Sequence, residues 1–213
     1  FKGVTAASWY KKGRLIIQRE LSEQVLADGG HFELSPMYHV LLVEDLLDII
    51  NLHQLYAQPL PFDPESVIPR MMHWLYTMIH PDGEISFFND AALGIAPTAS
   101  QVMDYANRLG LENLPLFENQ NGLTDLPDSG YTRMETTDAV VLVDSAPIGP
   151  EYQPAHAHAD TLSFELSLFG RRIIVNSGTS VYGKGINRHQ QRSTKNHSTV
   201  VINHQNSSEV LSG

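Results

Sequence analysis

Residues 154–169 read PAHAHADTLSFELSLF, and the second part of this stretch decides how the C-terminal half of the chain folds. From Thr161 to Phe169 apolar and polar side chains alternate, with leucine or phenylalanine at every even position. Alternation with a period of two places the apolar side chains on one face of a β-strand. We therefore predict a half-buried strand here, followed by a turn at Gly170-Arg171.

The polar first part of the stretch brings two imidazoles and a carboxylate, those of His156, His158 and Asp160, within five residues. If this segment is extended, side chains two residues apart point to the same face. Three titratable groups converging at the start of a strand suit a metal site or acid–base chemistry. A polar surface turn is the simpler interpretation of a His-x-His motif taken alone, so the rest of the chain has to decide.

The first half of the chain has the periodicity of helices. Ser35-Pro36 and Asp63-Pro64 each combine an N-cap residue with a proline that fits the first helical turn. Asp28-Gly29-Gly30 and Pro81-Asp82-Gly83 are typical helix stops. We expect helices over residues 6–26, 36–55, 64–78 and 100–109.

The pattern changes after the fourth expected helix. Residues 114–130 are rich in Asn, Asp, Gly and Pro, so they are predicted to form a linker. Helices followed by antiparallel strands indicate an α+β, multidomain chain and not a parallel α/β fold. The expected domains are residues 1–113, which are helical, and residues 131–213, which form β-structure. The predicted strands are residues 138–144, 161–169, 172–176 and 198–203.

The composition limits the class of protein. The chain has 213 residues, 42% of them apolar, which is enough to bury a core in one or two domains. No apolar run reaches membrane-spanning length, so we expect no membrane span. The absence of cysteine excludes disulfides and thiolate metal sites.

The net charge of −10 is unevenly distributed. Residues 171–213 carry 6 basic side chains and 1 acidic one, whereas residues 1–170 carry 8 and 23. The basic tract is either a solvated face or a docking surface for an anionic ligand. Nucleic acid is not expected as a ligand, because the chain is acidic overall and has no aromatic-plus-basic binding motif.

Three further segments concentrate polar side chains: residues 28–39, 175–183 and 188–199. Loops that deliver polar groups from a rigid scaffold are common functional sites. In the first of these segments, His31, Glu33 and His39 are candidates for substrate contacts. Helix capping and helix packing explain the same segment without a function.

Together these segments resemble the heparinase II/III-like polysaccharide lyase family, which includes alginate and heparan-type lyases. The resemblance covers nearly the whole chain. It depends on DGGHFELSPMYH at residues 28–39, HAHADTLSFELSLFGRRIIVNSGTSVYG at residues 156–183 and NHSTVVINHQNSSEV at residues 196–210. Their combination, order and helix-then-strand context make the resemblance specific.

The resemblance implies a fold and an activity. Members of this family have an (α/α) toroid followed by an antiparallel β-sandwich, with the active cleft between them. They cleave uronic-acid-containing polysaccharides by β-elimination. We therefore expect the end of a toroid, the start of a sandwich and an acidic polysaccharide as partner. The usual substrates of the family also imply a periplasmic or secreted location, whereas the sequence predicts no oligomeric state.

Candidate catalytic residues follow by match of motif. Tyr38 looks like the catalytic tyrosine of the family, an acid that for some substrate epimers also serves as base. His156 looks like the catalytic histidine, a second base or a charge stabiliser. Arg188 and Arg192 fit as contacts to substrate carboxylate or sulfate, because a guanidinium binds such groups through two parallel hydrogen bonds. Pairing with acidic residues of the helical part explains the two arginines equally well.

The resemblance also implies a structural zinc site. His158 and His197 look like two of its ligands, and Asn176 stands where metal-binding members have an aspartate. An amide oxygen is a weaker zinc ligand than a carboxylate, so zinc binding stays open. Asp160 could substitute if the geometry of the loop allows it.

One feature of the family has no counterpart in the chain. The Asn or His that neutralises the substrate carboxylate lies on an earlier toroid helix, and no matching segment precedes Phe1, so we expect the chain to be inactive by itself. Two other functions stay open. One is a non-catalytic carbohydrate-binding or assembly protein of polysaccharide biosynthesis. The other is a metal-dependent hydrolase using His156, His158 and His197, although no obvious general-base glutamate lies near these histidines.

Overall fold

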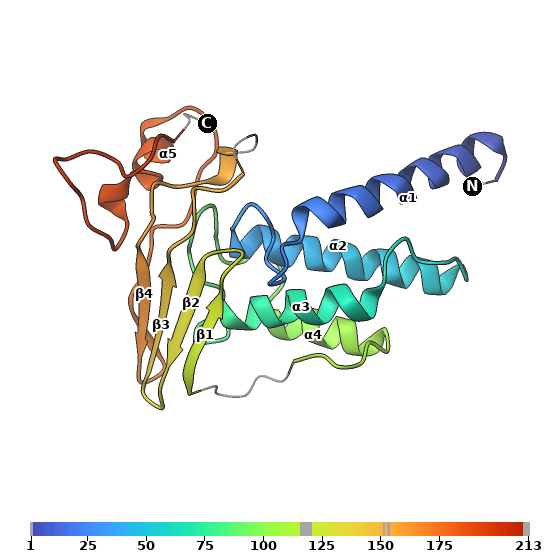
Figure 1. The fold of residues 1–213 in the computed structure, drawn as a ribbon, viewed down its shortest axis with the longest axis horizontal. Coiled ribbons are helices and arrows are strands. Elements are labelled where there is room, and N and C mark those ends of the chain that lie inside the picture. Colours follow the sequence, from blue (N-terminus) through green and yellow to red (C-terminus); the bar gives the residue numbers. More distant parts are fainter. Residues whose placement is uncertain (1, 116–120, 151, 153, 211–213) are drawn as a thin grey trace.

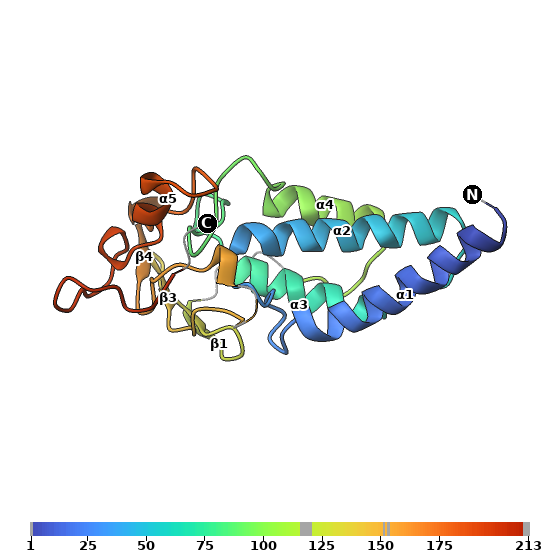
Figure 2. The same ribbon diagram turned by 90° about the horizontal axis from the view of Figure 1, so that it is seen from above.

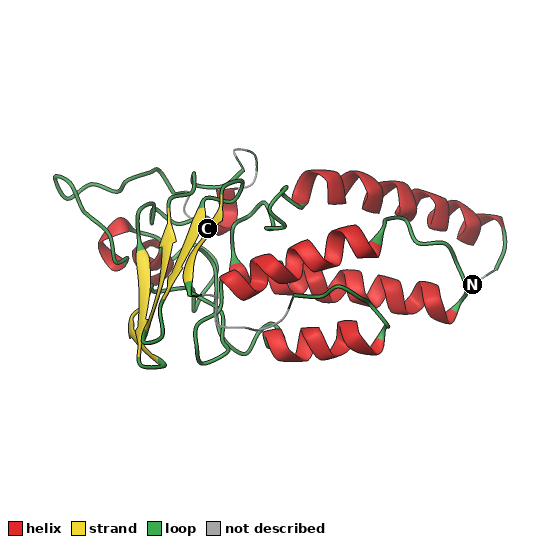
Figure 3. Ribbon diagram, turned by 60° about the horizontal axis from the view of Figure 1, so that its bottom comes forward, coloured by secondary structure: helices red, strands yellow, loops and turns green. Residues whose placement is uncertain are grey.

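The computed structural model describes residues 2–115, 121–150, 152 and 154–210. Helices from the first half of the chain fill one end of the molecule, and one antiparallel sheet fills the other (Figure 1, Figure 3). The ends of the helices, and not their sides, are turned toward the sheet. The predicted α+β class is confirmed in this form. Closure of a toroid and the second layer of a sandwich stay predictions.

The four expected helices are present, and two of them begin where the caps predict. The Ser35 hydroxyl accepts a hydrogen bond from the Tyr38 backbone N–H at 3.3 Å, and the Asp63 carboxylate accepts one from the Glu65 N–H at 3.2 Å. The helices are α1 (Val4–Gln24), α2 (Pro36–Leu55), α3 (Pro64–Thr77), α4 (Ala99–Arg108) and the short α5 (Ile186–Gln191). Two 3₁₀ turns are η1 (Pro154–His156) and η2 (Thr194–Asn196).

Helices α2, α3 and α4 share a hydrophobic core. Its centre includes Val40 and Leu47 of α2, Met71 and Leu75 of α3 and Val102 of α4, all buried. Helix α1 lies on the opposite side of α2 from α4 (Figure 1, Figure 2). Within Val4–Gln24 no residue is buried, so α1 is much more loosely attached than α2, α3 and α4.

The sheet has the strand order β1-β2-β3-β4-β5, with every neighbouring pair antiparallel. Strand β1 lies inside the stretch predicted to be a linker, of which residues 116–120 fall outside the described residues. The predicted strand at 198–203 is wrong: this segment forms an isolated bridge between Ile202 and Gln205, and Val200 is 78% exposed. The strands are β1 (Gly122–Leu126), β2 (Tyr131–Glu135), β3 (Ala139–Asp144), β4 (Phe164–Leu168) and β5 (Arg171–Ile174).

Strand β4 keeps the predicted alternation, but its polar face is the buried one. Glu165 and Ser167 are buried, whereas Phe164 on the other face is half-buried. The Glu165 carboxylate accepts hydrogen bonds at 2.7 Å from both His80 Nε2 and the Phe87 N–H. A buried carboxylate is tolerated when its oxygens are fully hydrogen-bonded. The loop after α3 is therefore fixed to the sheet by polar contacts.

A second set of hydrogen bonds holds the loop between α1 and α2 against the sheet. The Trp74 indole N–H donates to the Ser129 hydroxyl at 2.8 Å, and that hydroxyl donates to the Asp28 carboxylate at 2.8 Å. Asp28 thus ties its loop to the β1–β2 turn instead of capping a helix. A side chain at Gly30 would place its Cβ 2.5 Å from Trp74 Nε1, so the close approach requires glycine.

Candidate functional site

The start of α2, the turn η1 and the loop before α5 meet at one place. The Tyr38 ring stacks on the His156 imidazole, with ring centroids 4.1 Å apart and planes inclined by 16°. The Tyr38 and Tyr182 hydroxyl oxygens are 3.0 Å apart and share a hydrogen bond. Tyr182 is 58% exposed, so the place is open to solvent on that side. The fold thus brings together two residues predicted to be catalytic and adds a second tyrosine.

Glu33 orients the histidine of this group. Its carboxylate accepts a short hydrogen bond from His156 Nδ1, and the two side chains are 13% and 22% exposed. A carboxylate on Nδ1 fixes the tautomer of the imidazole and leaves Nε2 as the nitrogen that can take up a proton. Tyr38, His156, Tyr182 and Glu33 form what we call the tyrosine–histidine cluster.

The environment of Tyr38 keeps its proton on the phenol. Burial, followed by the hydrogen bond with Tyr182, raises the pKa of Tyr38 well above its ordinary value. The phenol is therefore a proton donor at neutral pH. With an oriented imidazole stacked on it, the cluster offers an acid and a base next to each other.

The segment around the His-x-His-x-Asp motif is not extended, contrary to the condition considered for the sequence. His156 ends the 3₁₀ turn η1 and contacts Glu33 and Tyr38, whereas His158 and Asp160 lie with His197 in a separate, buried group. The motif thus serves two places. In a strand, His156 and His158 would point to the same face. The 3₁₀ turn η1 breaks that geometry, so their side chains reach two different places.

The buried group has the donors of a metal site. One ligand atom from each of His158, Asp160 and His197 lies within 4.8 Å of the others, and we call these residues the candidate metal cluster. Neither ring nitrogen of His197, nor His158 Nδ1, makes a hydrogen bond of ordinary geometry within the described residues. Burial lowers the pKa of His197 to about 3, so its ring is in the neutral form that binds metals. These donors fit zinc.

The predicted ligand Asn176 is next to this cluster but has other partners. Its side-chain N–H donates to the Ser163 hydroxyl at 3.1 Å, and its oxygen accepts from the Ser198 N–H at 3.4 Å. The carboxylate of Asp160, which the sequence left as a conditional substitute, is the acidic group that lies within the cluster.

Asp90 lies between the two groups. Its carboxylate accepts a hydrogen bond from His158 Nε2 at 2.8 Å and both terminal N–H groups of Arg188. Burial by itself raises the pKa of Asp90, but the hydrogen bonds from His158 and Arg188 outweigh it, so the pKa is lowered and the group is ionised. The guanidinium of Arg188 in turn lies 5.4 Å from the centre of the Tyr182 ring.

Three of the predicted substrate contacts need correction because their side chains lie inside the protein. The Arg188 guanidinium binds the Asp90 carboxylate, which agrees with the alternative prediction that it pairs with an acidic residue of the first part of the chain. Arg192 is 1% exposed and donates to the backbone carbonyls of Ala157 and Pro154. His39 is fully buried, and its Nε2 donates to the Met71 carbonyl at 2.9 Å.

Of the two remaining predicted contacts, Glu33 belongs to the tyrosine–histidine cluster and His31 lies near it. His31 is 6% exposed and packs edge-on against Phe32. Burial lowers the pKa of His31 to about 4, so this side chain is neutral and offers no positive charge to an anionic substrate.

Comparison with known families decides what kind of chain this is. A model described as "Heparinase II/III N-terminus" matches residues 2–110, and one described as "Heparinase II/III-like, C-terminal" matches residues 118–213. The chain belongs to the heparinase II/III family. The resemblance read from three sequence segments is thereby confirmed over both halves of the chain.

Two curated relatives of this heparinase II/III chain carry the name heparin-sulfate lyase. The protein from Bacteroides stercoris is 29% identical over 222 residues, which cover 94% of this chain and 33% of the relative. The protein from Pedobacter heparinus is 27% identical over 225 residues, covering 93% and 32%. The chain therefore spans about a third of the length of the curated relatives it matches.

Solved structures share the fold of this heparinase II/III chain. The crystal structure of heparan sulfate lyase HepC from Pedobacter heparinus superposes with a TM-score of 0.75 at 23% identity, covering 94% of this chain and 34% of that one. A crystal structure of heparinase III gives a TM-score of 0.78 at 21% identity, covering 94% and 36%. At these identities the similarity concerns the fold alone.

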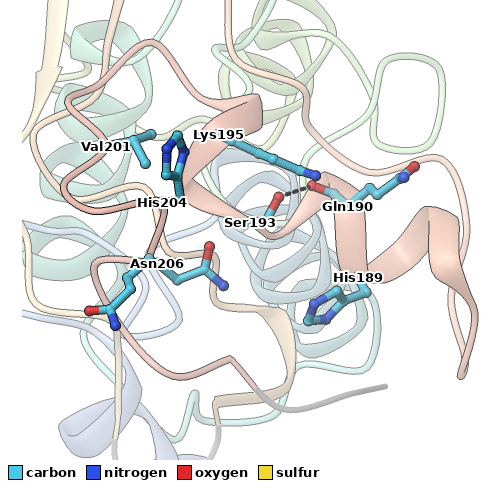
Figure 4. A pocket seen from close by; sticks show the side chains of 8 residues that line it. His189, Gln190, Ser193, Lys195, Val201, His204 and Asn206 are labelled. Atoms are coloured by element: carbon cyan, nitrogen blue, oxygen red, sulfur yellow. Dashed lines mark hydrogen bonds between the residues drawn. The ribbon is translucent and has the colours of Figure 1, made fainter.

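A pocket elsewhere on this heparinase II/III chain shares no residue with either cluster. It lies between α5, η2 and the segment after η2, and Figure 4 shows the side chains of His189, Lys195 and His204 around it. The Ser193 hydroxyl in its wall donates to the Gln190 carbonyl at 2.7 Å.

Among the described helices, none has the length and apolar character needed to cross a bilayer.

Proposed function

We propose that the full-length natural protein is a polysaccharide lyase that cleaves a uronic-acid-containing glycosaminoglycan by β-elimination, in the periplasm or outside the cell. Two relatives named heparin-sulfate lyase support the substrate class. The observation that carries the proposal is the stacking of Tyr38 on a histidine whose Nδ1 is bound by Glu33. This pair supplies the acid and the base that an elimination needs.

β-Elimination at a uronate has three requirements. A base must remove the proton from C5, which becomes acidic when the neighbouring carboxylate is neutralised. The C4–O4 bond then breaks as a double bond forms between C4 and C5. An acid must protonate O4 as it leaves. Water is not consumed, so the new non-reducing end carries an unsaturated uronate.

The cluster assigns the two proton transfers. His156 takes the C5 proton on Nε2, while Glu33 on Nδ1 stabilises the imidazolium that forms. Tyr38 donates its phenolic proton to O4, since its raised pKa keeps it protonated until the leaving oxygen develops negative charge. Tyr182 orients the Tyr38 hydroxyl through their hydrogen bond. The acid and the base return to their starting states when the proton moves back from His156 to Tyr38 through solvent.

Zinc fits the candidate metal cluster as a structural ion. His158, Asp160 and His197 would hold it, and a positively charged ion there would offset the cost of burying the Asp160 carboxylate. His158 is two residues from His156, so a fixed His158 keeps the turn η1 in place. No proton transfer in the proposed reaction uses this cluster.

The test is ultraviolet absorbance of the unsaturated product after the full-length natural protein is incubated with heparan sulfate, hyaluronan, alginate and a bacterial capsule. Tyr38→Phe removes the donated proton and keeps the stacked ring, so the rate should fall by about 10²–10⁴-fold. Tyr105→Phe is the matched control, because Tyr105 of α4 donates to Asp48 in the second half of α2, outside the tyrosine–histidine cluster.

The control should keep the wild-type rate. A Tyr38→Phe enzyme that also keeps it would contradict the proposal. Binding of one polysaccharide without any elimination by the wild-type protein would favour the non-catalytic, carbohydrate-binding alternative.

A further inference from the structure

Asp90 contacts each segment that supplies the site. Its side chain is fully buried. Its backbone N–H donates to the His156 carbonyl at 3.1 Å, and its backbone carbonyl accepts from the Ser35 hydroxyl at 2.6 Å. Ser35 is also the N-cap that binds the Tyr38 N–H. The main chain of Asp90 therefore touches the two segments that carry the proposed acid and base.

The side chain of Asp90 contacts His158 of the candidate metal cluster and Arg188 of α5. It accepts from His158 Nε2, which leaves Nδ1 of that ring without a proton and free to bind a metal ion. A carboxylate behind a metal-binding histidine fixes the tautomer and the ring orientation. The same carboxylate holds the Arg188 guanidinium through two parallel hydrogen bonds.

Arg188 connects Asp90 to the loop that carries Tyr182. Its guanidinium donates to the Thr179 hydroxyl at 3.0 Å and to the Ala155 carbonyl at 3.0 Å, and it packs against the Tyr182 ring. Without the Asp90 carboxylate, the buried guanidinium would lose its counter-charge, and the bonds to Thr179 and Ala155 would not offset the cost of burying it, so we expect it to move. Tyr182 would then no longer be held beside Tyr38.

We propose that Asp90 is a positioning residue that couples the candidate metal cluster to the tyrosine–histidine cluster, by orienting His158 for the metal ion and Arg188 for Tyr182. This inference rests on the proposed function. Asp90 touches no substrate in this role. Its effect is exerted through His158 on one side and through Arg188 on the other.

Asp90→Asn tests the proposal, because it keeps the shape of the side chain and both backbone contacts while removing the charge. In the full-length natural protein we expect zinc affinity, measured by competition with a chromophoric chelator, to fall by about 10–100-fold. We expect kcat to fall by a similar factor with KM unchanged. Asp82→Asn is the matched control: Asp82 also binds an arginine, Arg172, at 2.8 and 3.1 Å, outside both clusters.

Arg188→Gln separates the two arms of the proposal and serves if Asp90→Asn does not fold. It should lower kcat and leave zinc affinity unchanged, since the bond between Asp90 and His158 stays. Wild-type zinc affinity in Asp90→Asn, or no zinc binding by the wild-type protein, would overturn the inference. So would a wild-type kcat in Arg188→Gln. If the wild-type protein eliminates no substrate, the proposed function fails, and zinc affinity alone still decides the role of Asp90.

Discussion

The histidines of this chain show how much a residue's role depends on what surrounds it. His39 was a candidate for substrate contact, yet it is buried beside Trp74, with ring centroids 4.3 Å apart. His156, in a more exposed position, is paired with Glu33. Sequence spacing reports neither burial nor partner, because Glu33 lies 123 positions away from His156. A glutamate does therefore lie near the histidines, but it orients His156 and does not belong to the candidate metal cluster.

The buried His39 predicts sensitivity to acid. Burial lowers its pKa to about 3, so below the ordinary histidine pKa the unfolded chain binds a proton that the folded chain does not. Stability from this residue is therefore complete above about pH 6.5 and is lost as the pH falls toward 3. At about pH 5 the loss from His39 alone should be roughly 2 kcal/mol.

His39→Gln keeps a donor for the Met71 carbonyl and removes the titration, so the difference in unfolding free energy between neutral and acidic urea titrations should shrink by that amount. His204→Gln, at an exposed position, should leave the pH dependence unchanged. An unchanged pH dependence in His39→Gln would mean that another group controls acid unfolding.

Some site residues could be found from the sequence and others could not. Tyr38 and His156 came from motifs shared with a family, whereas nothing in their spacing of more than a hundred residues indicates that their rings stack. Tyr182 is not predicted as an individual residue, although residues 175–183, which include it, are among the segments that concentrate polar side chains. Asp90 could not be found from the sequence, since it stands in the segment between α3 and α4, where no motif marks it.

At the scale of elements, helix starts that depend on local contacts could be predicted from the sequence. Strand pairings between distant segments could not. Ser35-Pro36 and Asp63-Pro64 mark helix starts because an N-cap bonds only two or three residues ahead. Strand β1 depends on β2 for its ladder hydrogen bonds, and β2 on β1 and β3, whereas the sequences of β1 and β2 show little alternation. The run Val200–Ile202 is rich in β-branched residues but finds no strand partner among the described residues.

The alternation of polar and apolar residues in strand β4 does not show which of its two faces is buried. Its polar face is buried because Glu165 accepts from His80, from the Phe87 N–H and from the Asn176 N–H. Glu165→Leu should therefore lower the free energy of unfolding by about 3–5 kcal/mol, since it leaves buried donors without an acceptor. Chemical unfolding of the full-length natural protein measures this change.

Glu20→Leu on the loosely attached α1 is the comparison for Glu165→Leu, because Glu20 pairs with an exposed arginine on the surface. Its unfolding midpoint should match that of the wild-type protein. If both leucine variants unfold at the wild-type midpoint, the polar contacts of β4 do not hold the loop after α3.

At the scale of the whole molecule, the site forms where helices and sheet meet. Contacts of Asp28 and Glu165 fix two loops to the sheet. Asp90 then joins the start of α2 to η1 and to Arg188 of α5. A heparinase II/III chain that spans about a third of its curated relatives thus already contains both clusters. The activity itself is proposed for the full-length natural protein.

The most direct test of the proposed elimination is to measure the product masses by mass spectrometry. Elimination breaks the C4–O4 bond without consuming water, so the full-length natural protein should give product masses that sum to the substrate mass. Hydrolysis, the outcome expected of a metal-dependent hydrolase, would add the mass of one water for every bond cleaved. Products heavier by that mass would contradict the assignment of Tyr38 and His156 as the acid and base of a lyase.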